Sequence, residues 1–336
     1  MRKKWNLIGT ITIILLLVWL LYKIDLVKVY KLILETNILW LILSFITLLF
    51  SFIIWSIRWT KIFEGYVKPD KKFFLKVLLA GEFFNTITPG AGIGGEPFKA
   101  YIISKRYKKS NSKTLGYVLG DTFFKLIIWG FFIIFSASFI LIFIDIPSSL
   151  KITLELLIFS AILISTLVLS ILREKTNFNI GKLFKKFQKT KFLKKHFKTE
   201  NKFEEYLNLK YKNSLKTFKK TIKDKRNISI GIPLSFAFWM LQFLSAYFVF
   251  LALHQPASFI SVVIVFTLGT IIGSLSPFPG GIGTIESSTT LLYSIVGIAP
   301  ETALLAAFVN RFVYYILSLL IGGKMFLSLK KTHPKT

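Results

Sequence analysis

The chain has 336 residues, 53% of them hydrophobic, and a mean hydropathy of +0.61. It contains no cysteine, which excludes disulfides, thiolate nucleophiles and cysteine-ligated metals. The net charge of +28 would indicate nucleic-acid binding in a soluble protein. Several separate apolar runs, however, have the length of about twenty residues that a bilayer demands. We therefore predict an all-α polytopic membrane protein with no nucleic-acid partner.

About six full spans are expected along the chain. They are predicted at residues 7–22, 38–57, 114–144, 151–172, 228–253 and 301–322. The first run follows basic residues, as in a signal peptide, but no small-residue cleavage site comes after it, so we interpret it as a retained helix. Residues 1–336 are treated as a single transmembrane domain, in which a first half (1–172) and a second half (228–322) flank a loop at 173–227.

Basic residues gather in particular loops. Between Arg173 and Arg226 there are 19 Lys or Arg residues against 5 Asp or Glu. The positive-inside rule places both termini and the segments 58–76, 105–113 and 173–227 in the cytoplasm. The loops at 23–37, 145–150 and 254–258 are then expected outside the cell membrane. In 183–197, apolar residues recur at helical spacing among lysines, which is typical of an interfacial helix on anionic lipid. The alternative is that the lysines only set the orientation of the chain in the membrane.

This charge pattern requires two segments to return to the side from which they enter. They are 73–104, which contains "GEFFNTITPGAGIGGEP", and 259–297, which contains "SPFPGGIGTIE". Proline and glycine at these densities interrupt a helix. We therefore predict two oppositely oriented re-entrant hairpins.

The two broken segments also resemble each other. Gly81 aligns with Gly269, Thr88 with Ser276 and Pro89 with Pro277; after a one-residue insertion, Gly92–Gly94 aligns with Gly281–Gly283, and Glu96 comes close to Glu286. Chance similarity between turns is the alternative. An inverted repeat with interrupted helices is typical of secondary transporters, and irregular backbone at membrane depth must line a cavity or be buried in protein. Glycines there would let a ligand approach the backbone, and helix N-termini would offer amides to a lipid phosphate.

The stretches "NTITPGAGIGGEPFKAY", "SPFPGGIGTIE" and "NRFVYYILSLLIGG" resemble the flippase-like transmembrane domain of the lysylphosphatidylglycerol synthase type over nearly the whole chain. The resemblance implies movement of a polar-headed lipid between leaflets, such as an aminoacylated phospholipid or a polyprenyl-linked carrier. The expected partners are anionic or zwitterionic phospholipids or a polyprenyl phosphate carrier, and a homo-oligomer is left open. The soluble transferase domain of the full synthase is not expected, because the sequence ends about fourteen residues after the last span.

One position departs from the family pattern. Family members commonly place an acid directly before an arginine in the span after the first hairpin, but here Thr122 follows Asp121 and the nearest cation is Lys125. Asp121 and Lys125 are four residues apart and hence on one helix face. Ionisable groups within a span are usually functional; the alternative is a self-neutralising structural pair.

The remaining candidates also carry two interpretations each. Three glutamates flank the hairpin breaks: Glu82, Glu96 and Glu286. A functional role for them is recognition of a cationic headgroup or proton coupling. The structural alternative is that they cap the helices and brace the hairpins. Arg311, which matches an arginine of the family, and Lys99 would hold a phosphate; the alternative for Lys99 is that it extends to the cytoplasmic edge. The complete predicted substrate-binding set is Glu82, Asn85, Pro89, Gly92, Gly94, Gly95, Glu96, Lys99, Asp121, Lys125, Pro277, Pro279, Gly281, Gly283, Glu286 and Arg311.

No catalytic residue, cofactor or metal site is predicted. The histidines, His196, His254 and His333, are scattered through expected loops and the tail, whereas zinc requires converging ligands. We therefore predict a lipid flippase and not an enzyme. The alternatives are a scaffold for a separate lipid-modifying enzyme and a membrane-embedded enzyme acting on a lipid carrier.

Overall fold

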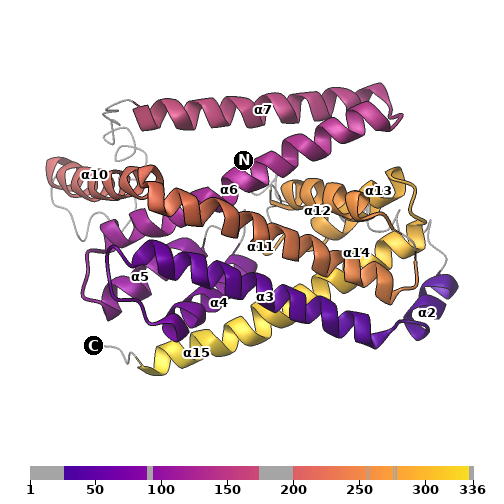
Figure 1. Ribbon diagram of the computed structural model, residues 1–336, viewed down its shortest axis with the longest axis horizontal. Helices are drawn as coiled ribbons and strands as arrows, with labels where there is room; N and C mark the ends of the chain where they lie inside the picture. The colour runs from indigo at the N-terminus through magenta and orange to yellow at the C-terminus, as the bar shows by residue number, and fades with distance from the viewer. Residues whose placement is uncertain are drawn as a thin grey trace.

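The computed structural model describes residues 26–88, 94–173, 200–255, 257–274, 276 and 278–332, and within these ranges its regular elements are all helical (Figure 1). The elements are α2 (Leu26–Leu34), α3 (Ile38–Phe63), α4 (Lys71–Ile87), α5 (Gly95–Arg106), α6 (Asn111–Phe143), α7 (Ser148–Arg173), α10 (Glu200–Lys223), α11 (Lys225–Ala252), α12 (Phe259–Ser274), α13 (Thr284–Ile295), α14 (Pro300–Tyr315), the π-helical η1 (Ile316–Ile321) and α15 (Gly322–Thr332).

Four helical segments are long and apolar enough to cross a membrane: α3, α6, α11 and the continuous run Pro300–Lys330. They confirm the long apolar helices predicted at 38–57, 114–144, 228–253 and 301–322. The span predicted at 151–172 is a helix, α7, and its crossing of a membrane stays a prediction. The span at 7–22 and the interfacial pattern at 183–197 lie outside the described residues.

Helices α3 and α11 form a long antiparallel pair that organises the molecule (Figure 1). Their contacts run from one end to the other: Asn37 N donates to Ala252 O (2.8 Å), Ser44 Oγ to Ser245 O (2.8 Å), Gln242 Nε2 to Ser51 Oγ (2.9 Å), and Arg226 pairs with Glu64. Small polar side chains let two helices approach closely and join by hydrogen bonds where no water is present. This pair therefore gives the molecule two distinct ends, a Glu64 end and an Ala252 end.

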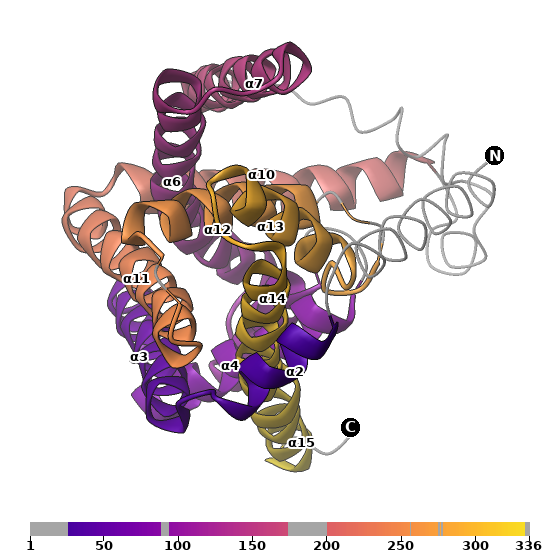
Figure 2. The same ribbon diagram turned by 90° about the vertical axis from the view of Figure 1, so that its right-hand side faces the viewer.

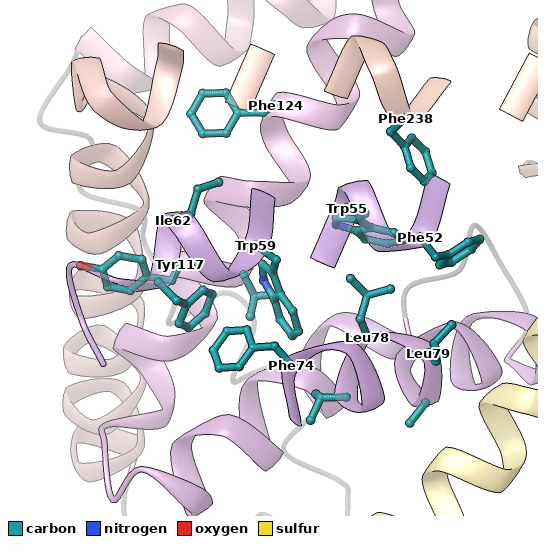
Figure 3. Packing of buried hydrophobic residues seen from close by; sticks show 14 of the residues in the cluster. Phe52, Trp55, Trp59, Ile62, Phe74, Leu78, Leu79, Tyr117, Phe124 and Phe238 are labelled. Atoms are coloured by element: carbon teal, nitrogen blue, oxygen red, sulfur yellow. The ribbon is translucent and has the colours of Figure 1, made fainter. Parts of the chain in front are cut away.

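Aromatic side chains fill the junction of α3, α4, α6 and α11 (Figure 3). On α3, Phe52, Trp55, Trp59 and Ile62 recur at three- and four-residue intervals, so they share one face, and each is at most 2% exposed. Trp59 meets Phe74 of α4 with ring centroids 5.0 Å apart. This packing holds α4 against the α3–α11 pair.

Helices α4 and α5 form the first hairpin. The rings of Phe74 and Tyr107 are 6.2 Å apart near its open end, and those of Phe84 and Phe98 stack at 4.4 Å near its break. Because residues later in α4 meet residues earlier in α5, the two helices run antiparallel. A Cβ on Gly81 would lie 2.7 Å from the Lys99 side chain, so glycine permits this close approach.

Helices α12 and α13 form the second hairpin in the same way. A Cβ on Gly269 would overlap Thr289, and one on Gly273 would overlap Ile285. The order of these contacts again makes the two helices antiparallel. Gly269, which the sequence aligns with Gly81, also faces the second helix of its hairpin.

The two hairpins open toward opposite ends of the α3–α11 pair (Figure 1). The loops that flank the first lie together at the Glu64 end, where Asp70 N donates to the Tyr107 hydroxyl at 3.0 Å. The second follows directly from the Ala252 end. Viewed from that end, α11, α12 and α14 surround the middle of the molecule (Figure 2).

The structure corrects several boundaries. Helix α10 occupies much of the loop predicted at 173–227, and α2 lies within the loop predicted at 23–37. The span predicted at 38–57 continues as a helix to Phe63, so Arg58, which we had assigned to a basic loop, lies inside α3. Its side chain is fully buried and paired with Asp121 of α6. A membrane helix can contain an arginine when a partner carboxylate neutralises it, and hydropathy alone does not register that partner.

Candidate functional site

A partly open cavity of about 720 Å³ lies between the two hairpins and is lined also by α3, α6, α11 and α14. Most of its wall is apolar and aromatic. The aromatic lining residues are Phe52, Trp55, Trp129, Phe238, Trp239, Phe250, Phe266, Phe278, Tyr293 and Tyr314. The charged ones are Glu82, Glu96, Lys125 and Arg311. A cavity of this composition suits a ligand with both a charged part and an apolar part.

Asn85 ties the two halves of the first hairpin together across the break. Its Oδ1 accepts a hydrogen bond from Gly95 N at 2.7 Å, and its Nδ2 donates to Glu82 Oε1 at 3.0 Å. A Cβ on Gly95 would overlap the Gly81 carbonyl and Asn85. Gly95 is thus required for close packing, while Glu82 and Asn85 present polar atoms to the cavity.

Gly94 differs from its aligned partner Gly283 in backbone conformation. Gly94 has a right-handed φ of −67°, and a Cβ there would lie 2.6 Å from the Thr88 side chain. Gly283 has a φ of +79°, a backbone angle that residues with a side chain rarely adopt. The two glycines are therefore required for different reasons.

Arg311 holds the loop of the second hairpin in place. Its Nε donates to Glu286 Oε1 at 3.2 Å, and its Nη2 donates to the Gly280 carbonyl and to the Tyr315 hydroxyl. Glu286 Oε2 in turn accepts from Gly283 N at 2.7 Å. Among the residues the structure describes, Arg311 Nη1 has no hydrogen-bond partner, so one amino group of this lining residue remains for a ligand.

Asp121 does not pair with Lys125, contrary to our sequence-based alternative. It accepts from Arg58 Nε at 2.7 Å, from Arg58 Nη2 at 2.9 Å and from Trp55 Nε1 at 2.8 Å. It is 1% exposed and lies behind the cavity wall. Nothing in a single sequence predicts that residues 58 and 121 are in contact.

Lys99 pairs with Glu96 at 2.8 Å and is 1% exposed, so it does not extend to the membrane edge. Its ammonium lies 4.8 Å from the centroid of the Trp55 ring. Glu96 and Glu286 are therefore neutralised in two separate pairs. Arg311 neutralises Glu286, and Lys99 neutralises Glu96.

Glu82 and Lys125 have no ion-pair partner in the described part of the chain. The Tyr314 hydroxyl donates a long hydrogen bond, 3.5 Å, to Glu82 Oε2. Lys125 Nζ lies 3.8 Å from the centroid of the Trp55 ring, a close cation–π contact. Both residues line the cavity, Glu82 from α4 and Lys125 from α6.

The structure thus brings part of the predicted set together. Glu82, Asn85, Glu96, Lys125, Gly281 and Arg311 line the cavity. Seven predicted residues are not on the cavity lining: Gly94, Gly95, Lys99, Asp121, Pro279, Gly283 and Glu286. Three others lie outside the described residues: Pro89, Gly92 and Pro277. Four lining residues were not in the predicted set: Trp55, Trp129, Asn310 and Tyr314. Only the last two lie in a stretch, "NRFVYY", on which the family resemblance rests. Within the described ranges, no cluster of three or more His, Cys, Asp or Glu could hold a metal ion.

The sequence profile of the lysylphosphatidylglycerol synthase TM region matches residues 6–322. The chain is 27% identical to the UPF0104 membrane protein PH1989 of Pyrococcus horikoshii over 98% of both chains. It is 31% identical to the UPF0104 membrane protein MJ1595 of Methanocaldococcus jannaschii, over 93% of this chain and 91% of that one. A phosphatidylglycerol lysyltransferase of Staphylococcus aureus is 28% identical over 102 residues, which are 30% of this chain and 12% of that protein. The chain therefore belongs to the family of the lysylphosphatidylglycerol synthase TM region and is a multi-pass integral membrane protein.

Proposed function

We propose that the protein is a lipid transporter, without enzymatic activity, that moves a polar-headed lipid between the leaflets of the cell membrane. The observation that carries the proposal is the cavity of about 720 Å³, where charged side chains and aromatic walls meet at the breaks of both hairpins. A headgroup requires polar partners away from water, whereas acyl or prenyl chains require apolar surface. The cavity offers both.

The proposal includes the topology. Helices α4–α5 and α12–α13 would be re-entrant hairpins from opposite membrane faces, six spans would surround them, and both termini would be cytoplasmic. Interrupted helices that meet at one site in an inverted repeat allow access to alternate from one side of a membrane to the other. The antiparallel hairpins and their opposed openings support this arrangement.

The test is lipid crossing in vesicles. Purified protein is reconstituted with a fluorescent lipid, and a membrane-impermeant reductant then quenches the fluorophores that reach the outer leaflet. We expect quenching to exceed the outer-leaflet half that protein-free vesicles show. Thr270→Phe, which places a large ring on the cavity lining, should suppress crossing.

Ile272→Phe is the matched control, since this residue is on the same helix, is 42% exposed and is not on the lining. It should leave crossing unchanged. Vesicles that quench like protein-free ones would overturn the proposal, as would a chemically altered lipid recovered after incubation.

A further inference from the structure

We propose that the cavity selects lipids whose headgroup carries one positive and one negative charge, with Glu82 facing the cation and Lys125 facing the phosphate. This inference names the substrate class of the transporter proposed above and rests on that function. It follows from the balance of charges around the cavity.

Three ion pairs account for most of the charge there: Arg58–Asp121, Lys99–Glu96 and Arg311–Glu286. Each pair joins one base to one acid and leaves no net charge. In the part of the chain that the structure describes, Glu82 and Lys125 are the lining charges that remain without an ion-pair partner. Glu82 and Lys125 attract each other but do not touch, and charges at membrane depth without direct contacts are costly. A ligand that contacts both is therefore favoured over one that contacts either alone.

Lys125 is held in a position to receive a phosphate. Its ammonium lies over the Trp55 ring at 3.8 Å, and the Trp55 Nε1 donates to Asp121. Asp121 is itself held by Arg58 through two hydrogen bonds. The Trp55 ring is therefore held in place by Asp121, and the lysine above the ring lies on the cavity lining. Arg311, on the same lining, contributes an Nη1 that has no hydrogen-bond partner among the described residues.

The acidic side of the cavity fits an ammonium group. Glu82 accepts one hydrogen bond at Oε1, from Asn85, and a long one at Oε2, from the Tyr314 hydroxyl. Lone pairs of this carboxylate remain for a ligand. Glu96, also on the lining, has an Oε2 that is buried without a hydrogen-bond partner in the described chain. An ammonium donates three hydrogen bonds. Glu82 and Glu96, both from the first hairpin, can accept two of them.

Other headgroups leave one of these charges unmatched. A headgroup with a phosphate and no amine would satisfy Lys125 but leave Glu82 buried beside a second anion. A headgroup with net positive charge would repel Lys125. Specificity arises from such penalties as much as from attraction.

The test is binding of short-chain lipids to the full chain in detergent. The probes are dihexanoyl-phosphatidylethanolamine, whose headgroup has an amine and a phosphate, and dihexanoyl-phosphatidylglycerol, whose headgroup has the phosphate alone. We expect the ethanolamine lipid to bind about tenfold more tightly. Glu82→Gln, which keeps the shape of the side chain and an oxygen for Asn85, should abolish this preference without weakening the glycerol lipid.

Lys125→Gln should weaken both lipids, because both carry the phosphate. Glu155→Gln, on an exposed position of α7, is the matched control and should change neither affinity. Thermal unfolding of each variant verifies that it is folded. Equal affinities of the wild type for the two lipids, or a preference that survives Glu82→Gln, would overturn the inference.

The same variants separate this inference from the transport proposal. A protein that binds the ethanolamine lipid selectively but moves no lipid across vesicles would overturn transport and retain the headgroup assignment. A protein that moves both lipids at equal rates, with equal affinities, would retain transport and overturn the assignment.

Discussion

Arg58 and Asp121 show how a charged pair can be buried inside a membrane protein. Their side chains are 0% and 2% exposed and meet at 2.7 Å. The Asp121 carboxylate accepts two hydrogen bonds from the Arg58 guanidinium and a third from Trp55. The remaining Arg58 nitrogen donates to the Ser235 hydroxyl. Removal of one partner leaves the other charge without compensation, which costs more than the pair itself contributes.

We therefore predict that Asp121→Leu lowers the free energy of unfolding by about 3–5 kcal/mol. The double variant Arg58→Met, Asp121→Leu should lose much less than the sum of the two single variants, because no charge is then left buried. Thermal unfolding in detergent, followed by tryptophan fluorescence, measures all three. Additive losses would show that the two side chains act independently.

Arg311 requires the geometry of a guanidinium and not only its charge. Its donors extend in different directions to Glu286, Gly280 and Tyr315, and a lysine ammonium cannot reproduce this fork. We predict that Arg311→Lys impairs lipid crossing nearly as much as Arg311→Ala. Crossing rates in vesicles, corrected for reconstituted protein, measure the effect. If Arg311→Lys crossed lipid at the wild-type rate, only the positive charge of Arg311 would matter and the geometry of its donors would not.

Gly283 and Gly94 were expected to matter for one shared reason, and the structure assigns two. We predict that Gly283→Val costs about 1–3 kcal/mol through its left-handed backbone conformation. Gly94→Val acts instead through a collision with Thr88. Thr88→Ala combined with Gly94→Val should therefore recover part of the stability, since alanine lacks both Thr88 atoms that lie 2.6 Å from the added Cβ. Thr88→Ala combined with Gly283→Val should recover nothing, and thermal unfolding compares these variants.

At the scale of elements, the hairpins depend on glycines that let one helix approach another. Gly273 of α12 faces Ile285 of α13 so closely that an added Cβ would overlap the isoleucine side chain. Overpacking of this kind typically costs about 1–3 kcal/mol. Gly130 of α6 is a matched position, because no atom beyond its chain neighbours and the adjacent backbone of its own helix lies within 4 Å of the site of its Cβ.

We predict that Gly273→Ala destabilises the protein and that adding Ile285→Ala restores part of the loss. Gly130→Ala should be neutral or stabilising, since alanine favours a helix over glycine. Thermal unfolding of the set tests this. If Gly273→Ala and Gly130→Ala changed the free energy of unfolding equally, helix propensity, and not contact between α12 and α13, would decide the outcome.

At the scale of the whole molecule, the structure supports the predicted topology through contacts between loops. Lys68 and Lys109 border one shallow pocket at the Glu64 end, and Asn37 N bonds Ala252 O at the other end. We predict that single cysteines at Lys68 and Lys109 react with a membrane-impermeant reagent from the cytoplasmic side, and that one at Gln255 reacts from outside. The chain has no cysteine of its own to interfere. Labelling of Lys68 and Lys109 from opposite faces would contradict both the topology and the structure.

The sequence by itself determined the long apolar helices and the interruptions of the two hairpins, but not α2 and α10, which lie in segments predicted as loops. Hydropathy and length identify the apolar helices, because the backbone of a span must satisfy its own hydrogen bonds. Proline and glycine locate the breaks after Thr88 and Ser274, because those residues do not continue a helix. Rare charges within apolar runs, such as Glu82 and Lys125, mark the cavity, because burial of a charge is costly unless something compensates it.

Only the tertiary structure decided which charges meet. Arg58 compensates Asp121 across a separation of 63 residues, while Lys125, four residues from Asp121, contacts Trp55 instead. The sequence gives the spacing of residues along each helix, but the rotation of one helix against another is set by the packing of side chains from many segments. Ion pairs between helices depend on that rotation, and so does the distinction between a charge held in a pair and one left facing the cavity.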